Sequence, residues 1–335
     1  MPEYLVKSPV AFIIFNRPDT TERVFAEIAR AQPRKLLVVA DGPRADRPGE
    51  AEKCAAARAV IDRVDWDCEV LKNYSDTNLG CKKRVSSGLD WVFATVEEAI
   101  ILEDDCLPHP SFFRFCDELL ELYRDDERIM QVSGVNFLSS WHSIPESYLF
   151  SRYGGIWGWA TWRSSWKHYD VTMAKWPAKR NEPNWLKSVC ETKAEFRTRI
   201  ISFDLVYRNG IDTWDYQWIF CKLLCNGISV IPSNNMIENI GFGSDATHTN
   251  HAVNELYMSS RQPMEFPLIH GGEVSRDTIY DLKYAREIFA SESLLKLYAK
   301  TFIKNCLKVF GIRNEQFSHL RMMWQRHCNL SDTIK

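Results

Sequence analysis

The sequence predicts an α/β fold in which helices cover both faces of a mostly parallel central sheet. Short apolar runs alternate with helical patterns over the first 130 residues. These apolar runs are continuous rather than alternating, which is typical of strands buried on both faces. The runs end in polar clusters, and the carboxyl ends of parallel strands meet at the sheet edge where ligands bind.

Four strands and four helices are predicted in this first part, in strict alternation. The strands are expected within residues 9–15, 35–41, 67–76 and 98–105, and the helices within 20–32, 51–64, 81–96 and 110–126. Apolar side chains recur at helical spacing in the helical segments, and turn-forming residues separate them from the strands. The first helix is expected to use Asp19, Thr20 or Thr21 as its N-cap.

The pattern changes after residue 130. A strand is predicted within 128–137, and a Gly- and Trp-rich loop that leads into a helix within 151–170. Two further helices are predicted within 183–210 and 212–227, and a short strand with a turn within 228–241. In the helix over 212–227, Trp214, Trp218 and Leu224 lie on one face and Gly227 is the expected C-cap. A polar loop follows, and the last 50 residues are expected to be helical.

Composition excludes several classes of function. The net charge of −2, from 42 basic and 44 acidic residues, gives no electrostatic argument for nucleic-acid binding. The 10 cysteines contain no CxxC pair, so a structural zinc site is not expected. There is no leader pattern and no long apolar run, so we expect a cytoplasmic protein with reduced thiols. Dinucleotide-binding and P-loop motifs are absent from the first 130 residues.

Three successive acids, Glu103, Asp104 and Asp105, end the fourth apolar run. Successive side chains of an extended segment point to opposite faces, so Asp104 and Asp105 cannot both bind one ligand atom. One acid can bind a hard divalent cation while its neighbour meets a hydroxyl of the same bound molecule. The alternative is a solvated strand end, which the buried strand before these acids makes less favourable.

The stretch AIILEDD, placed after NLGCKKRVSSGLDWVF, resembles the metal-binding region of nucleotide-sugar glycosyltransferases with the GT-A fold. Among these it is most similar to the N-acetylglucosaminyltransferase I-like group, over about residues 8–250. The resemblance implies a Rossmann-like sheet, a UDP-sugar donor, Mn²⁺ or Mg²⁺, a single carboxylate base and inversion of the anomeric centre.

The resemblance also implies roles for residues at the strand ends. Asp105 matches the direct metal ligand, Asp104 the acid that binds the donor ribose, and Glu103 the acid that approaches the donor sugar. The other positions expected to bind the nucleotide are Asn16 and Arg17 beside it, Asp41 for the uracil, the turn of Asn78, Leu79 and Gly80 along the nucleoside, and one of Lys82, Lys83 and Arg84 for the diphosphate. For the three basic residues, a solvated helix start is the alternative.

Asp215, in the stretch DTWDYQW, matches the acid that takes the proton from the acceptor hydroxyl, and Asp212 is the second choice. Direct displacement with inversion needs one base within hydrogen-bond reach of the nucleophile. The alternative is that either acid only caps this helix.

The stretch GGIWGWATWRSSW is expected to line the donor sugar and the acceptor. Gly154 and Gly155 permit close approach to a ligand, and Trp157, Trp159, Trp162 and Trp166 would form an acceptor wall, with Arg163 as a phosphate or acceptor contact. Packing of these rings in the core is the alternative. In the polar loop, His248, or else His251, stands where many GT-A enzymes add a metal or diphosphate ligand, although the most similar group does not depend on one.

The predicted domains are a GT-A catalytic domain over 1–255 and a mainly helical extension over 256–335. The catalytic domain would divide into a nucleotide-binding half (1–130) and an acceptor-binding half (131–255). Four lysines of the extension recur at four-residue spacing, at Lys296, Lys300, Lys304 and Lys308. This stripe suits either peripheral contact with the inner membrane face, where a lipid-linked acceptor would fit, or a docking helix with a solvated side.

The sequence therefore predicts a metal-dependent, inverting glycosyltransferase that moves a sugar from a UDP-sugar to a saccharide or glycoconjugate, in bacterial envelope polysaccharide synthesis. Two alternatives remain. A sugar-nucleotide pyrophosphorylase would be expected to carry a Gly-rich basic loop after its first strand, where this chain has NRPDTTERV. A non-catalytic glycan-binding protein would leave the acids at the strand ends unexplained.

Overall fold

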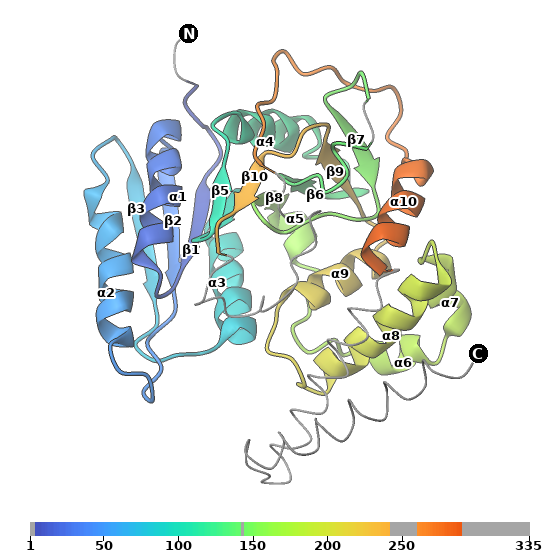
Figure 1. The fold of residues 1–335 in the computed structure, drawn as a ribbon, viewed down its shortest axis with the longest axis horizontal. Helices are drawn as coiled ribbons and strands as arrows, with labels where there is room; N and C mark the ends of the chain where they lie inside the picture. The colour runs from blue at the N-terminus through green and yellow to red at the C-terminus, as the bar shows by residue number, and fades with distance from the viewer. Residues whose placement is uncertain (1–3, 142–143, 242–259, 290–335) are drawn as a thin grey trace, which may run out of the picture.

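An eight-stranded sheet forms the centre of the molecule, and helices lie on both of its faces (Figure 1). The structure is a computed structural model that describes residues 4–141, 144–241 and 260–289. The strand order is β3-β2-β1-β4-β8-β6-β9-β7, and β8 and β7 run against the direction of the others. The predicted α/β fold with a mostly parallel sheet is confirmed.

The first half alternates strands and helices as predicted. Its elements are β1 (Val10–Ile14), α1 (Pro18–Ala31), β2 (Lys35–Ala40), α2 (Glu50–Val60), the 3₁₀ helix η1 (Ile61–Arg63), β3 (Glu69–Tyr74), α3 (Cys81–Thr95), β4 (Glu98–Glu103), β5 (Cys106–Pro108) and α4 (Ser111–Leu122). β1 pairs in parallel with β2 and with β4, and β2 pairs in parallel with β3. Their carboxyl ends therefore meet at one edge.

The second half contains shorter elements. They are β6 (Ile129–Ser133), β7 (Tyr148–Ser151), β8 (Trp159–Trp162), α5 (Arg163–Trp166), α6 (Trp176–Arg180), α7 (Pro183–Ser188), α8 (Lys193–Tyr207), α9 (Asp215–Leu224), β9 (Ile228–Pro232), β10 (Ile237–Asn239) and α10 (Thr278–Phe289). The helices α6 to α9 lie together (Figure 1), around a core of their own that includes Trp176, Phe203 and Phe220. One face of α9 also packs on the sheet, where Trp218 contacts Trp159 of β8.

The loop and helix predicted over 151–170 are confirmed in part: residues 152–158 form a loop and a short helix follows, but the strand between them was missed. Residues Trp159–Trp162 form β8, a central strand that is antiparallel to both β4 and β6, and only the four residues of α5 are helical. All four residues of β8 are buried. Aromatic and β-branched side chains favour a strand that is covered on both faces, but four residues are too few to display a period.

The core lies on both faces of the sheet, as the period of two in a strand requires. Phe12 and Ile14 pack on the side of α1 and α4, whereas Ala11 and Ile13 pack on the side of α3 with Trp159. A fully buried side chain of this size stabilises the fold by about 1.5–3 kcal/mol. The continuous apolar runs in the sequence are explained by this two-sided burial.

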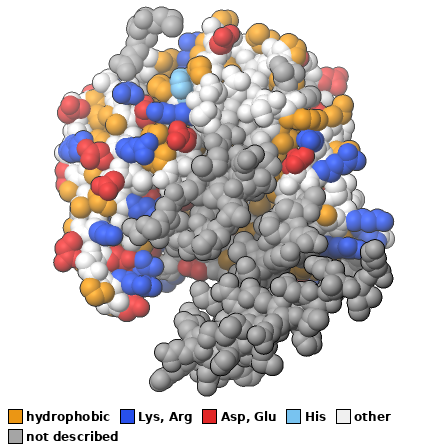
Figure 2. Space-filling model, in the orientation of Figure 1, with side chains coloured by type: hydrophobic (Ala, Val, Ile, Leu, Met, Phe, Trp, Pro, Cys, Tyr) orange, Lys and Arg blue, Asp and Glu red, His pale blue; other side chains and the backbone are white. Residues whose placement is uncertain are grey.

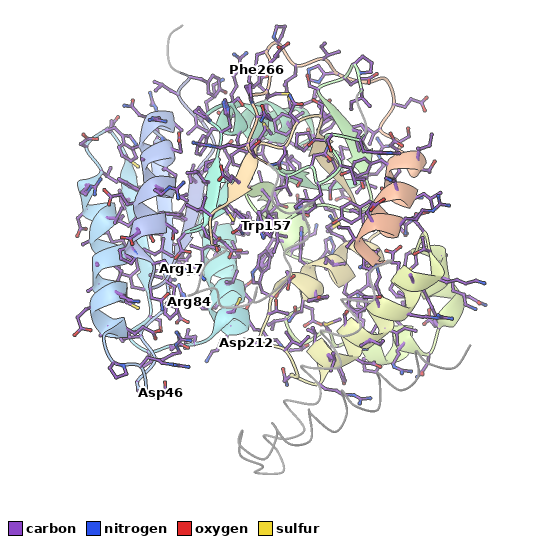
Figure 3. The ribbon with its side chains drawn as sticks, viewed as in Figure 1. Arg17, Asp46, Arg84, Trp157, Asp212 and Phe266 are labelled. Carbon is purple, nitrogen blue, oxygen red and sulfur yellow. The ribbon has the colours of Figure 1, made fainter. Side chains whose placement is uncertain are left out.

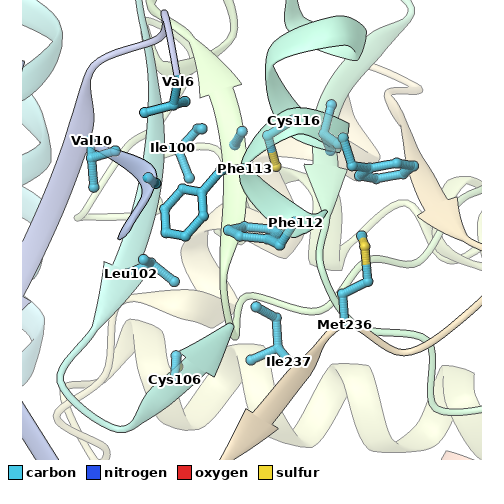
Figure 4. Packing of buried hydrophobic residues seen from close by; sticks show 14 of the residues in the cluster. Val6, Val10, Ile100, Leu102, Cys106, Phe112, Phe113, Cys116, Met236 and Ile237 are labelled. Carbon is cyan, nitrogen blue, oxygen red and sulfur yellow. The ribbon is translucent and has the colours of Figure 1, made fainter. Parts of the chain in front are cut away.

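A small second sheet places a segment from late in the chain over the three acids. β5 pairs antiparallel with β10, so that Cys106 lies opposite Asn239. In the core cluster next to it, the Phe112 ring of α4 lies toward Met236 and Ile237, whereas the Phe113 ring lies toward Ile100 and Leu102 (Figure 4). The amide of Ile240 donates a hydrogen bond to the Asp105 carbonyl oxygen at 2.8 Å. The chain is thereby held against the end of β4.

Two helix ends differ from the sequence-based expectation. The N-cap of α1 is Arg17, because Pro18 already takes the first helical position. The C-cap of α9 is Cys225, and Asn226 adopts the left-handed conformation with φ 52°. The amide of Gly227 then donates to the Lys222 carbonyl oxygen at 2.8 Å, and the C-cap lies two residues before the predicted Gly227.

Of the extension predicted over 256–335, the structure describes residues 260–289. Residues 260–277 are not helical, and they lead to a bridge between Arg276 and Phe150. The mainly helical character of the whole extension stays a prediction. The helix α10 follows and packs against α8 and β7. The lysine stripe at 296–308 lies outside the described residues.

The surface carries charges of both signs, in agreement with the net charge near zero. On the face shown in Figure 2, acidic and basic side chains alternate over the first half. Within the described part of the chain, every helix is too short or too polar to span a bilayer.

Candidate active site

The polar strand ends meet at one edge of the sheet, as predicted. β1 pairs with β4 so that Ile13 lies opposite Glu103, and β1 pairs with β2 so that Ile14 lies opposite Ala40. Arg17, Asp41 and Asp105 follow these strand ends directly. In Figure 3, Arg17, Arg84 and Asp212 gather around α3, whereas Asp46 lies farther out in the loop after β2.

Asp41 organises the turn of Asn78, Leu79 and Gly80. Its carboxylate accepts hydrogen bonds from the Leu79 amide at 2.9 Å, from the Gly80 amide at 3.1 Å and from Asn78 Nδ2 at 3.0 Å. Burial raises the pKa of Asp41, and the amides of Leu79, Gly42 and Gly80 act in the opposite direction. Asp41, which was predicted to accept a hydrogen bond from a uracil, therefore already accepts hydrogen bonds from the turn of Asn78, Leu79 and Gly80.

Asp212 caps α3 and not the helix that follows it in sequence. Its carboxylate accepts hydrogen bonds from the amides of Cys81 at 3.1 Å and Lys82 at 2.9 Å. Gly80 has φ 81°, and a side chain there would meet Asp212 Oδ2 at 2.6 Å. Only glycine fits this close approach. These contacts occupy both carboxylate oxygens of Asp212, which disfavours it as the second-choice base.

Asp105 forms an ion pair with Arg17. Arg17 Nη1 lies 2.9 Å from Asp105 Oδ2, and both side chains are about one fifth exposed. Gly241 lies directly against this pair, because a Cβ on Gly241 would come within 2.2 Å of Asp105 Oδ2 and 2.9 Å of Arg17 Nη1. The pair is accessible from one side and closed by the chain after β10 on the other.

The two acids before Asp105 point apart, although the backbone is not extended here as predicted: β4 ends at Glu103, and Asp104 and Asp105 form the turn to β5. Asp104 is 8% exposed and accepts a hydrogen bond from the Phe15 amide at 3.0 Å, at the end of β1. Glu103 lies on the side of Cys81 and Asp215. Burial raises the pKa of both carboxyls, and repulsion from Asp105 adds to it. The three side chains thus point in different directions: Asp104 toward Phe15, Glu103 toward Asp215 and Asp105 toward Arg17.

Asp215 is the first residue of α9 and lies close enough to Glu103 to raise its pKa. The Thr213 hydroxyl donates to Asp215 Oδ1, and Gln217 Nε2 donates to the Thr213 carbonyl oxygen at 2.8 Å. These contacts fix the carboxylate at the helix start. Asp215 therefore lies where the first half meets the second.

Of the remaining residues predicted to contact the nucleotide, three bond to other protein groups and one is exposed to solvent. Asn16 Nδ2 donates to Glu50 Oε1 at 2.9 Å. Arg84 is buried and donates to the Asn73 carbonyl oxygen and side chain, so it faces the end of β3. Lys82 Nζ donates to Asn209 Oδ1 at 2.8 Å. Lys83 is exposed, and its role as a diphosphate contact stays a prediction.

The predicted tryptophan wall is corrected. Trp159 is 0% exposed because it lies in β8, where it stacks on Trp214 with ring centroids 5.8 Å apart, so it cannot contact a sugar as predicted. Trp162 and Trp166 are also buried. Trp157, which precedes the strand, lines a cavity. Aromatic residues in a strand that crosses the sheet centre pack in the core, and only those in the preceding loop reach the edge.

Two further predictions in this segment are also revised. Arg163 forms an ion pair with Glu97 at 2.6 Å, which lies before β4, at the opposite edge from the strand ends. Gly155 lines the cavity, but a Cβ there would come within 2.0 Å of Val135 Cγ2. The glycine is thus required by packing against the protein itself.

A divalent cation would find one suitable carboxylate here, that of Asp105. In the described part of the chain, no group of three or more His, Cys, Asp or Glu side chains could hold a metal ion. Mg²⁺ and Mn²⁺ are often held by one or two carboxylates, with substrate phosphates and water as the other ligands. This donor set fits such a cation only together with a diphosphate. His248 and His251 lie outside the described residues.

The sequence-based prediction missed a polar cluster on the cavity side of Asp215. Tyr153 donates to Glu195 Oε2 at 2.8 Å, and the buried pair of Glu195 and Arg199 is closed at 2.7 Å. Lys222 and Gln131 form a second buried contact, at 3.0 Å. A lysine surrounded by apolar residues in the stretch WIFCKLLC was the available signal for a buried charge.

Comparisons with known proteins leave the family open. No family model matches the chain, and no curated protein matches it. Among solved structures, a 4-diphosphocytidyl-2C-methyl-D-erythritol synthase from Anaerococcus prevotii DSM 20548 is similar with a TM-score of 0.31 and 12% identity, over 51% of this chain and 76% of that one. A UDP-glucose pyrophosphorylase in complex with UDP-glucose is similar with a TM-score of 0.22 and 10% identity, over 43% and 62%.

Proposed function

We propose that this protein is an enzyme that binds a nucleotide sugar at the edge formed by β1, β2 and β4, and that it transfers the sugar to an acceptor hydroxyl. The observation that supports this proposal best is the position of Asp215. This carboxylate lies near Glu103 at the sheet edge, and it also lines a cavity built by the second half of the chain. A donor on one side and an acceptor on the other would meet at Asp215.

In this proposal, Asp215 is the base that takes the proton from the acceptor hydroxyl. A positioned base typically contributes a factor of about 10² to 10⁴ to the rate. Arg17 and Asp105 would face the donor diphosphate, where the guanidinium of Arg17 stabilises the charge on the leaving group. A divalent cation, when bound, would add to this stabilisation, and Asp105 would hold it. Asp41 and Asp212 would keep the turn over 78–82 in place for the nucleoside.

Nucleotidyl transfer, as in a sugar-nucleotide pyrophosphorylase, is the second candidate. The two solved structures named above are a synthase and a pyrophosphorylase of this kind, so we keep this candidate. Their TM-scores of 0.31 and 0.22 do not distinguish nucleotidyl transfer from sugar transfer. The local structure favours sugar transfer. β1 ends at Ile14 and α1 begins at Pro18, and a connection of this length offers little backbone to cradle a triphosphate.

One experiment separates the two reactions. Purified protein is first screened by thermal shift against UDP-, GDP-, CMP- and dTDP-sugars, with and without Mn²⁺. The sugar that binds is then offered with acceptors, and separately with inorganic pyrophosphate. Acceptor-dependent release of the nucleotide leaving group, a nucleoside diphosphate or, from a CMP-sugar, CMP, would support sugar transfer. Formation of nucleoside triphosphate and sugar phosphate from pyrophosphate would establish the second candidate. Binding of no nucleotide sugar would refute the proposal.

A further inference from the structure

A cavity of about 230 Å³ lies on the far side of Asp215 from the three acids. It is enclosed by the segment after β7 and by α8, α9 and α10. The side chains of Tyr153, Trp157, Tyr216 and Tyr284 contribute to its walls. Aromatic rings with a polar edge are suited to packing against the apolar face of a sugar ring while hydrogen bonding to its hydroxyls. The cavity therefore has the walls of a saccharide subsite.

Lys222 lines this cavity and has no acidic partner in the described part of the chain. Its side chain is 3% exposed, and Nζ donates to Gln131 Oε1 at 3.0 Å and to the Ser229 hydroxyl, both of which are neutral. Among the residues that the structure describes, no carboxylate lies within ion-pair distance of Nζ. An ammonium has three donors, so one remains for the cavity that Lys222 lines.

The other charges of the lining do not cancel that of Lys222. Arg199 is paired with Glu195 at 2.7 Å, and Arg152 lies 3.6 Å from Glu191. Arg199 thus has a close carboxylate partner, whereas Arg152 shares Glu191 with Arg276, which lies 3.0 Å from that carboxylate. Burial lowers the pKa of Lys222 to about 7, which is the direction expected for an amine that lacks a counter-ion. A buried amine in this position is stabilised in its charged form when an anion enters the cavity.

Helix geometry sets Asp215 and Lys222 on one face of α9. They are separated by seven residues, which is roughly two turns and about 10 Å along the axis. A molecule in the cavity would therefore present one end to Asp215 and the other to Lys222. This arrangement suits an acceptor whose reacting hydroxyl and charged group lie at opposite ends.

We propose that this cavity takes an acceptor sugar that carries a compact oxyanion, a carboxylate or a phosphate, and that Lys222 pairs with that group. The role as an acceptor subsite rests on the proposed sugar transfer. The preference for an anionic sugar does not, because it depends only on Lys222 and the cavity walls.

The test is a calorimetric titration of the full chain, without a nucleotide sugar, at pH 7. Glucuronic acid, glucose 6-phosphate and glucose are the probes. We expect one of the two anionic sugars to bind at least 10-fold more tightly than glucose, and the comparison of the two identifies the oxyanion. Equal affinity for all three sugars, or no binding of any, would overturn the proposal.

Lys222→Gln removes the charge and keeps a group that can bond to Ser229, and we expect it to abolish the preference for the anionic sugar. Lys283→Met is the matched control, because Lys283 lies on α10 and is paired with Glu287; it should keep the preference. An unchanged preference in folded Lys222→Gln would also overturn the proposal. If Lys222→Gln does not fold, the comparison of charged and neutral sugars on the native chain decides. Nucleotide-sugar binding is measured in parallel, so failure of the proposed function is recognised separately.

Discussion

The carboxylate of Asp212 accepts a hydrogen bond from the Lys82 amide at 2.9 Å, across 130 residues of sequence. A second bond, from Cys81, lies beside it at 3.1 Å. Together they tie the loop before α9 to the first turn of α3. Asp41 holds the preceding residues of the same segment from the other side. The turn expected to lie along a nucleoside is thus fixed by one carboxylate from each half of the chain.

Asp212→Ala should therefore affect stability more than chemistry. Loss of an acceptor at a helix N-terminus costs about 0.5–2 kcal/mol, and urea unfolding measures this loss directly. Asp46→Ala is the control, because Asp46 is an exposed residue of the loop after β2, and it should change stability by less than about 0.5 kcal/mol. A variant of Asp212 with native stability and abolished turnover would instead make Asp212 the base.

Asp215→Asn should show the opposite pattern. The amide keeps the shape of the side chain and can still meet Thr213, so the fold and the affinity for the nucleotide sugar should be retained. Transfer should fall by about 10²-fold or more, since the base is removed. Steady-state kinetics with saturating donor measures this loss. Turnover within a few-fold of the native value would exclude Asp215 from proton transfer.

Gly241→Ala tests the ion pair of Arg17 and Asp105 without altering either residue. The added Cβ would come within 2.2 Å of Asp105 Oδ2, so the carboxylate must move and its pairing with Arg17 must change. We expect nucleotide-sugar affinity to fall by about 10-fold, an effect of about 1.4 kcal/mol. Gly272→Ala is the matched control, because nothing lies within 4 Å of a Cβ there. Equal affinity in both variants would show that the pair does not contact the donor.

Asp105→Asn tests the metal dependence. If Asp105 holds a divalent cation together with the diphosphate, the variant should bind the nucleotide sugar equally with and without Mn²⁺. The native protein should bind it more tightly with Mn²⁺. Thermal shift with the nucleotide sugar, in the presence of EDTA or of Mn²⁺, measures this metal dependence for the native protein and for the variant. A native protein indifferent to Mn²⁺ and to EDTA would remove the cation from the proposal and leave Arg17 as the counter-charge.

Asp281 should make the stability depend on pH. It is 0% exposed and bonded to Ser151 and Arg276, and burial raises its pKa to about 6. The native state then binds the proton more tightly than the unfolded state does. This stabilising contribution is complete below the ordinary pKa of about 4 and is lost as the pH rises through 6.

The difference in unfolding free energy between the native chain and Asp281→Asn should therefore shift across pH 4–6, by at most about 3 kcal/mol. The sign is fixed: the native chain loses stability relative to the variant as the pH rises. Urea unfolding at several pH values measures it. A difference independent of pH would show that the burial of Asp281 does not perturb its protonation.

The sequence by itself determined the first half of the fold and the edge where its polar residues meet. Continuous apolar runs, each ended by a turn, can only be strands that are buried on both sides, and their carboxyl ends then share one edge. The position of Asp105 at the end of β4 follows from this pattern, although the predicted strand included Asp105 and β4 ends at Glu103. So does the helix of Asp215, because its apolar period is long enough to be recognised.

Tertiary structure alone decided which polar groups are available and which are already bonded. Asp41 and Asp212 have the same side chain as Asp215, but the amides of the 78–82 segment, distant in sequence, take up their oxygens. Trp157 and Trp159 differ by two positions, yet one lines a cavity and the other is sealed in the sheet by β4 and β6. Burial and hydrogen bonding of this kind depend on contacts between distant segments, and no local pattern encodes them.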